Sequence, residues 1–200
     1  DMAFFRLVPN LTIMAPKDFK EFEDMLESAV NLKRPVVIRY PRGGEDTKIK
    51  FQKHDKIKLG KAEIIKEGKE ISIIAIGKTV ARAMEVSNML EKNKISAEVI
   101  NARFLKPLDK EIIKNSINKT KFVITIEDGT IINGLGTAIK ELIVNEKIKE
   151  VEIKSYAYPD EFIKHGEVSE LEKIYHQDSK LIYEEIVKMK KKNKKIERRK

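Results

Sequence analysis

Two arginines at the end of a short apolar stretch are the side chains best placed to bind a ligand. Residues 35–43 have the sequence PVVIRYPRG, whose β-branched run predicts a buried strand that Pro41 brings to an end. Arg39 and Arg42 therefore stand at the carboxyl end of a strand, where open α/β sheets bind their ligands. A guanidinium can grip two phosphate oxygens at once. Taken alone, the stretch favours a plainer interpretation, in which both arginines form salt bridges.

An acidic pair, Glu127-Asp128, closes the most strongly β-forming stretch of the chain, residues 121–127 (KFVITIE). A carboxylate in that position could serve as a general base or as a metal ligand. Asp128-Gly129 is also a common turn pair, because aspartate and glycine both tolerate turn conformations. We favour the turn.

Two glycines, Gly134 and Gly136, come just before a predicted helix, as they do in dinucleotide-binding sites. The third glycine of that motif would stand at position 139, which is Ile139, and the upstream turn is too long. We therefore interpret the pair as a tight turn with close helix packing.

The remaining chemistry-bearing residues form no recognisable centre. His54, His165 and His176 lack the spacing of metal ligands, and the serines have no accompanying histidine and acid. The chain has no cysteine, which excludes a disulfide, a thiolate zinc site and a cysteine nucleophile. On these residues alone, the second half of the chain resembles a structural or regulatory domain rather than a catalytic one.

Composition and charge narrow the class of protein. The chain has 200 residues, of which 41% are hydrophobic, and this is enough for a folded core. Its net charge is +9, but residues 188–200 alone contribute nine Lys or Arg against one Glu. The rest is nearly neutral, so this basic tail (188–200) is interpreted as a solvated extension and no nucleic-acid partner is expected. With neither a signal peptide nor a membrane-spanning stretch in view, we expect no membrane partner and a cytoplasmic location, or a plastid in a eukaryote.

The elements around the arginines predict a β-α-β unit in residues 1–44. Leu11–Ala15 is a predicted strand, and Asp18 with Glu21 predicts a capping box that opens a helix. A second strand over Val36–Tyr40 would then pair in parallel with the first. Since two strands make no stable sheet, we expect others upstream of Asp1 or from another chain. The apolar opening of the sequence also suggests a piece of something longer.

The later part of the chain predicts a second domain over residues 60–187, after a polar linker at 45–59. Strands and helices alternate, which predicts an α/β fold of about five strands, mostly parallel, with helices on both faces. Strands are expected at 61–66, 70–76, 96–101, 121–127 and 148–156, and helices after Thr79 and Asp109 and over 136–145, 168–174 and 178–189.

Several motifs together give the chain a family resemblance. It resembles the 1-deoxy-D-xylulose-5-phosphate synthases, thiamine-diphosphate enzymes of the transketolase superfamily, from Asp1 to about Val187. The motifs that carry the likeness keep their order and spacing: residues 1–10 (DMAFFRLVPN), 13–18 (IMAPKD), 37–43 (VIRYPRG), 60–61 (GK), 101–109 (NARFLKPLD), 134–136 (GLG) and 159–166 (PDEFIKHG). Departures are the Phe4-Phe5 pair, the basic tail and residues 174–179 (IYHQDS), which lack the family's usual glycine.

The resemblance implies a homodimeric transferase that condenses pyruvate with D-glyceraldehyde 3-phosphate, with loss of CO2, for isoprenoid precursor, thiamine and pyridoxal synthesis. Its cofactors would be thiamine diphosphate and Mg2+. This chain would supply the later part of the pyrimidine-binding domain, at 1–44, and the transketolase C-terminal domain. Of the residues that the family uses, only Arg42 carries over, as a ligand of the substrate phosphate, with Arg39 as a second candidate.

The resemblance also implies that the catalytic and cofactor-binding residues lie elsewhere. The family's diphosphate-binding GDG motif does not occur in this sequence, and its catalytic glutamate and histidines would precede Asp1. We therefore expect this chain alone to be inactive and to bind neither thiamine diphosphate nor a metal. Two alternatives stay open: a β subunit of a thiamine-dependent 2-oxoacid dehydrogenase, and a non-catalytic assembly module.

Overall fold

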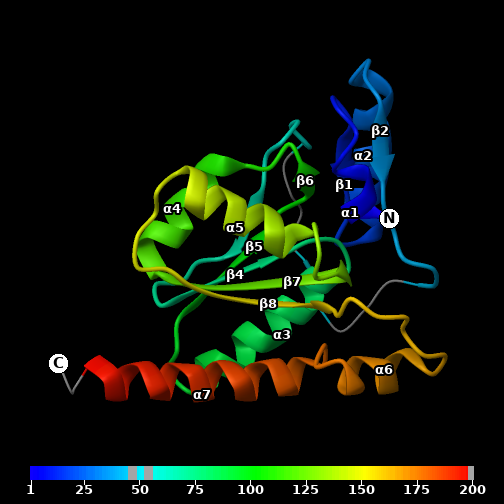
Figure 1. Ribbon diagram of the computed structural model, residues 1–200. Coiled ribbons are helices and arrows are strands. Elements are labelled where there is room, and N and C mark those ends of the chain that lie inside the picture. Colours follow the sequence, from blue (N-terminus) through cyan, green and yellow to red (C-terminus); the bar gives the residue numbers. More distant parts are fainter. Residues whose placement is uncertain (45–48, 52–55, 198–200) are drawn as a thin grey trace.

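A five-stranded sheet forms the centre of the larger unit in the computed structural model, which describes residues 1–44, 49–51 and 56–197, without side chains at 193–197 (Figure 1). The strand order is β3-β5-β4-β7-β8. The strands are β3 (Glu63–Lys66), β4 (Ile71–Ala75), β5 (Ala97–Asn101), β7 (Phe122–Thr130) and β8 (Glu152–Tyr158). Only β3 runs antiparallel to its neighbour within this sheet. The α/β class with a mostly parallel sheet is thus confirmed.

Helices cover both faces of this sheet, as the alternating pattern predicts. Helices α4 (Lys110–Thr120) and α5 (Leu135–Asn145) lie on one face, while α3 (Thr79–Lys92) and α7 (Ser179–Glu197) lie on the other (Figure 1). Because helices cover both faces of the sheet, its strands carry apolar side chains on both faces, and these side chains form two separate hydrophobic clusters.

Helix α7 runs across the boundary that the sequence places at residue 187. Met189 packs partly buried against the core, and Lys190 pairs with Glu70. The first residues of the basic tail therefore continue a docked helix rather than form a solvated extension.

A second, three-stranded sheet has the order β2-β1-β6. The strands β1 (Thr12–Met14) and β2 (Val36–Ile38) pair in parallel, as predicted, and helix α2 (Phe19–Asn31) connects them along the chain. Its third strand is β6 (Phe104–Lys106), which pairs antiparallel with β1. The third strand described in this sheet thus comes from later in the same chain, and the expected strands from upstream of Asp1 or from another chain stay a prediction.

Two local expectations for the N-terminal unit were wrong. Strand β2 is half-buried along its length rather than buried. Asp18 does cap α2, since its side chain accepts a hydrogen bond from the Glu21 backbone N–H. Glu21 itself is fully buried and completes no capping box; it accepts instead from the Lys17 backbone and from side chains described below. The apolar side of α2 also leaves Phe19 and Leu26 exposed.

Short helices complete the structure. Helix α1 (Met2–Phe5) opens the chain and buries Met2 in the core beneath α5, and α6 (Val168–Ile174) precedes α7. Lys78 rather than Thr79 is the N-cap of α3, and the Thr79 hydroxyl lies within hydrogen-bond distance of the Ile76 and Ile126 carbonyls. None of the helices described here is both long and apolar enough to cross a membrane.

Candidate functional site

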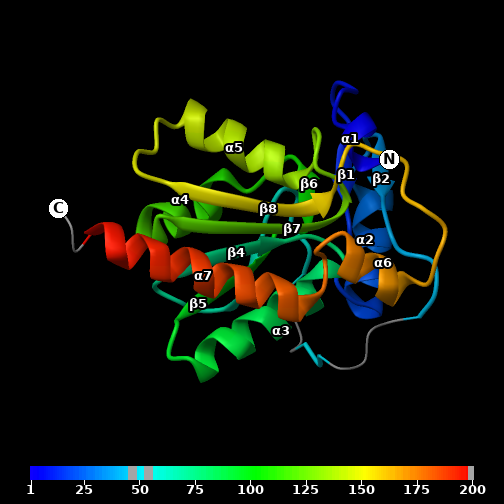
Figure 2. The same cartoon turned by 60° about the horizontal axis from the view of Figure 1, so that its bottom comes forward.

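A cavity of about 630 Å³ lies where the two units meet. In Figure 2, helices α2 and α6 and the start of α3 gather at the end of the molecule that carries the N-terminus, and their residues line this cavity. The loop after β2 closes another side with Tyr40, Pro41 and Arg42. Arg42 is exposed there, in the loop after β2, and this strand ends at Ile38 rather than at Tyr40 as predicted.

Arg39 takes a different place from Arg42. Its guanidinium Nη2 lies 2.8 Å from Asp128 Oδ2, and its Nε lies 3.8 Å from Asp1 Oδ2. Arg39 is not among the residues that line the cavity. It therefore forms the salt bridge of the plainer interpretation, which fastens the end of β2 to the large sheet.

Asp128 is the residue that joins the two units at this point. Strand β7 continues to Thr130, although its pairing register shifts after Ile126, so Asp128-Gly129 is not the turn that the sequence favoured. Asp128 Oδ2 also lies 3.0 Å from Lys78 Nζ. Burial by itself raises the pKa of Asp128, but the charges of Arg39 and Lys78 outweigh it and hold that pKa below its usual value. Asp128 is thus a carboxylate shared by two cations.

Other charged groups in the cavity wall are paired with one another. Arg82 pairs with Glu172, and Glu85 accepts a hydrogen bond from Ser179. Asp178 caps α7 by accepting from the backbone of its first turn. Three further cations, Lys78, Arg42 and Lys173, lie in the same wall. The cavity therefore offers cationic groups to a small anion.

Glu127 is engaged by its own chain. Its carboxylate oxygens accept hydrogen bonds from the N–H groups of Leu135, at 2.8 Å, and Gly136, at 2.9 Å, at the start of α5. Its exposed fraction is 1%. Burial raises the pKa of Glu127, and the two backbone N–H groups counteract this only in part. Glu127 is a helix-capping group rather than a base or metal ligand open to substrate.

The glycines around this cap pack as a tight turn should. A β-carbon at Gly134 would lie 2.1 Å from the Glu127 carboxylate, and one at Gly136 would lie 2.5 Å from Ser155 Oγ. The N–H groups that would hold a dinucleotide phosphate are already occupied by Glu127. This geometry agrees with the close-packing interpretation and leaves no dinucleotide site at α5.

The histidines build no centre within the described part of the chain. His176 Nδ1 lies 3.1 Å from Glu185 Oε1 on α7, and His165 is exposed. His54 lies outside the described residues. Among the residues that the structure does describe, no three His, Cys, Asp or Glu side chains gather as a metal site would require.

A buried ionic cluster behind the cavity was missed by the sequence analysis. Glu21 accepts hydrogen bonds from Lys17 Nζ at 3.1 Å and from Arg103 Nε at 2.7 Å. Asn101 Nδ2 lies 2.9 Å from Glu21 Oε1. Burial works to raise the pKa of Glu21, but Lys17 and Arg103 prevail and lower it. This cluster fixes α2 to the large sheet and so holds one wall of the cavity.

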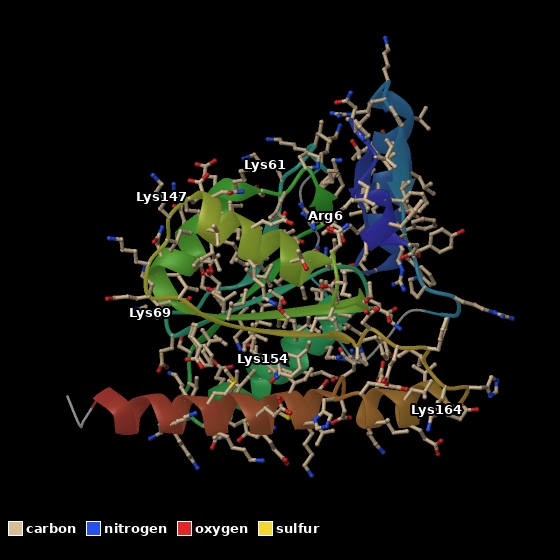
Figure 3. The ribbon with its side chains drawn as sticks, in the orientation of Figure 1. Arg6, Lys61, Lys69, Lys147, Lys154 and Lys164 are labelled. Atoms are coloured by element: carbon tan, nitrogen blue, oxygen red, sulfur yellow. The ribbon has the colours of Figure 1, made fainter. Side chains whose placement is uncertain are left out.

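A second set of polar contacts attaches the N-terminal segment on its other side. Arg6 lies where that segment meets α5 (Figure 3), and its Nη1 donates to Asn133 Oδ1 at 2.7 Å. Arg6 also pairs with Glu141 on α5. The N-terminal segment is thus held to the large unit at Arg6 as well as at Glu21 and Arg39.

Two protein-family models match the chain. "Transketolase, C-terminal domain" matches residues 60–182, and "Transketolase, pyrimidine binding domain" matches residues 1–44.

Curated relatives named 1-deoxy-D-xylulose-5-phosphate synthase match most of the chain. The protein from Halothermothrix orenii is 42% identical over 192 residues, which are 94% of this chain and 30% of the relative. The one from Desulfotalea psychrophila is 43% identical over 169 residues, covering 83% of this chain and 26% of the relative. The chain thus spans about 30% of the length of such relatives.

Solved structures share the fold. A chain described as a split gene transketolase, in an inactive β4 tetramer, is 28% identical with a TM-score of 0.84; the match covers 94% of this chain and 60% of that one. The transketolase of Campylobacter jejuni is 20% identical with a TM-score of 0.71, over 93% of this chain and 27% of that one. The second likeness concerns the fold alone.

Proposed function

Because this chain belongs to the transketolase family, we propose that it is part of a 1-deoxy-D-xylulose-5-phosphate synthase. That enzyme would join pyruvate to D-glyceraldehyde 3-phosphate and release CO2, so that two three-carbon substrates give one five-carbon product. It would work as a homodimer with thiamine diphosphate and Mg2+, in isoprenoid precursor synthesis. The relatives' shared name over 94% of this chain supports the proposal.

The observation that carries the site assignment is the position of Arg42. It is exposed in the wall of the cavity at the end of β2. There its planar donors can form charge-assisted hydrogen bonds to a phosphate. We assign Arg42 to the phosphate group of glyceraldehyde 3-phosphate. Arg39, which is engaged by Asp128 at 2.8 Å, would hold the strand end in place rather than bind the phosphate.

The described residues do not fit the thiamine diphosphate group. A diphosphate needs backbone N–H donors and a metal ion, and the N–H groups at the start of α5 already bind Glu127. No cluster of metal ligands occurs in the described part of the chain. We therefore assign the cofactor to another part of the enzyme, and we expect this chain alone to be inactive.

The contribution of Arg42 to the reaction would be to bind and orient the acceptor. The phosphate is remote from the carbon–carbon bond being made, so its binding energy fixes the position of the aldehyde carbon. Pyruvate carries no phosphate and would not use this contact. The two substrates should therefore respond differently to a change at Arg42.

The test is the Arg42→Ala variant of the complete enzyme that contains this sequence. Losing charge-assisted bonds of about 1.5–3 kcal/mol should reduce kcat/KM for glyceraldehyde 3-phosphate roughly 10- to 150-fold, mainly through KM. Decarboxylation of pyruvate should be nearly unchanged. Arg42→Lys should recover part of the loss, since it restores the charge but not the paired donors.

Two outcomes would count against this function. An unchanged KM for the phosphorylated acceptor together with lower thermal stability would leave Arg42 a structural role only. An enzyme equally active with unphosphorylated acceptors would favour the 2-oxoacid dehydrogenase alternative.

A further inference from the structure

Lys78 lines the same cavity as Arg42 but comes from the other unit of the chain. It is the N-cap residue of α3, and its side chain is 33% exposed. The following residues Ala81 and Arg82 also line the cavity, so the first turn of α3 faces it. The positive end of the α3 dipole therefore adds to the charge of the lysine.

The contacts of Lys78 leave it able to bind a further anion. Its Nζ lies 3.0 Å from Asp128 Oδ2, the oxygen that Arg39 Nη2 also contacts, at 2.8 Å. One carboxylate is thus shared by two cations, although Asp1 adds a weaker contact to Arg39 at 3.8 Å. An ammonium group has three N–H donors, and the contact with Asp128 satisfies one of them.

The acidic residues in the same wall have other partners. Glu172 pairs with Arg82, Glu85 accepts from Ser179, and Asp178 and Asp18 cap helices. With those carboxylates engaged, Asp128 is the anion that holds Lys78 in position. A dianion that enters the cavity could then contact both the Lys78 ammonium group and the Arg42 guanidinium group.

We propose that Lys78 is a second ligand of the substrate's phosphate, so that the phosphate monoester is held by side chains from both units. This inference rests on the proposed function, which places the phosphate at Arg42. Lys78 would bind it as a point charge and Arg42 through paired donors. Asp128 would be a positioning residue, because it orients Lys78 and, through Arg39, the end of β2.

The experiment is a titration of the full 200-residue chain with glyceraldehyde 3-phosphate and, separately, inorganic phosphate, followed by backbone NMR shifts. Lys78→Met should raise Kd roughly tenfold, because a charge-assisted hydrogen bond is lost. Lys92→Met, at the far end of the same helix, should leave Kd unchanged and serves as the matched control. Tighter binding of the ester than of free phosphate would mark the site as one for the substrate rather than for phosphate alone.

A structural role for Lys78 can be separated from a binding role. Lys78→Arg keeps the charge and should keep most of the affinity for phosphate. This holds even if Lys78→Met and Lys78→Arg both change Tm. If Lys78→Met keeps the wild-type Kd while Arg42→Ala raises it, the inference fails and the proposed function stands. If the unaltered chain binds neither ligand, or if neither variant changes Kd, the phosphate site is overturned for both Arg42 and Lys78, while the synthase reaction itself is tested in the complete enzyme.

Discussion

Charged residues stand towards the carboxyl ends of both β2 and β7, yet their surroundings differ. In the last part of β7, Glu127 is buried and binds the first N–H groups of α5. In the loop after β2, Arg42 is exposed in a cavity wall. Both positions satisfy the rule that ligands bind at the carboxyl ends of parallel strands. The difference shows that a charged residue in such a position can bind a ligand only where no other group of the same chain already binds it.

The largest effect expected from this comparison is on Glu127. Glu127→Ala would leave two buried N–H groups without an acceptor, and the free energy of unfolding should fall by about 3 kcal/mol. Urea denaturation of the 200-residue chain measures this. Phosphate binding by the folded variant should be unchanged, in contrast to Arg42→Ala. A variant as stable as the wild type would show that the cap contributes little to stability. It would contradict the contrast drawn here between Glu127 and Arg42.

A smaller loss is expected where the glycine turn packs against the sheet. In Gly136→Ala the new methyl would lie 2.5 Å from Ser155 Oγ and 3.0 Å from Thr125 Oγ1. Overpacking of this kind costs about 1–3 kcal/mol. Gly43→Ala offers a control for added volume, since a β-carbon there meets nothing within 4 Å, although its positive φ adds some strain of its own. Equal melting temperatures for Gly136→Ala and the wild type would contradict the close packing inferred here.

The smallest effect should appear in the pH dependence of stability, because folding shifts the pKa values of Glu127 and Asp128 in opposite directions. The pKa of Asp128 is lowered in the folded state, so its contribution is present above the unfolded pKa of about 3.9 and is lost as pH falls through the folded pKa. Asp128→Asn should remove that acid-side loss, which amounts to about 1 kcal/mol.

Glu127 gives the opposite slope. Because its pKa is raised on folding, its contribution is largest below the unfolded pKa and declines as pH rises through the folded pKa. Glu127→Gln should therefore flatten the decline above pH ~4.3, while Asp128→Asn flattens the loss on the acid side. Identical pH profiles for the two variants would show that the carboxylates do not differ as described.

The sequence predicted the layers of the large unit because hydrophobic periodicity is a local property. The inner face of α3 is an example: Val80, Ala83 and Leu90 are fully buried, as their spacing requires. The exposed position of Arg42 also followed from local signals, namely a β-branched run ended by proline. Its role as a phosphate ligand came from the family resemblance and not from spacing.

Contacts between distant segments could not be predicted in this way. Glu21 has the spacing of a capping box, and nothing near it in the sequence announces Arg103 as its partner at 2.7 Å. Asp128-Gly129 carries a local turn signal, which pairing with β8 and the charges of Arg39 and Lys78 override. The role of Lys78 could not be predicted either, because a single lysine before a helix gives no sign that Asp128 will lie 3.0 Å from it.

The pairing of β6 with β1 bears on how the chain is made. Met14 pairs with Phe104, so the small sheet cannot be completed until the ribosome has released the segment that carries β6. Among the residues described here, β1 and β2 would until then form only a two-stranded ribbon, which by itself is at best marginally stable in water. Closing so long a loop is also slow compared with forming local helices. We therefore expect fragments of this chain that stop before Phe104 to leave residues 1–44 more open to proteases than the 200-residue chain does.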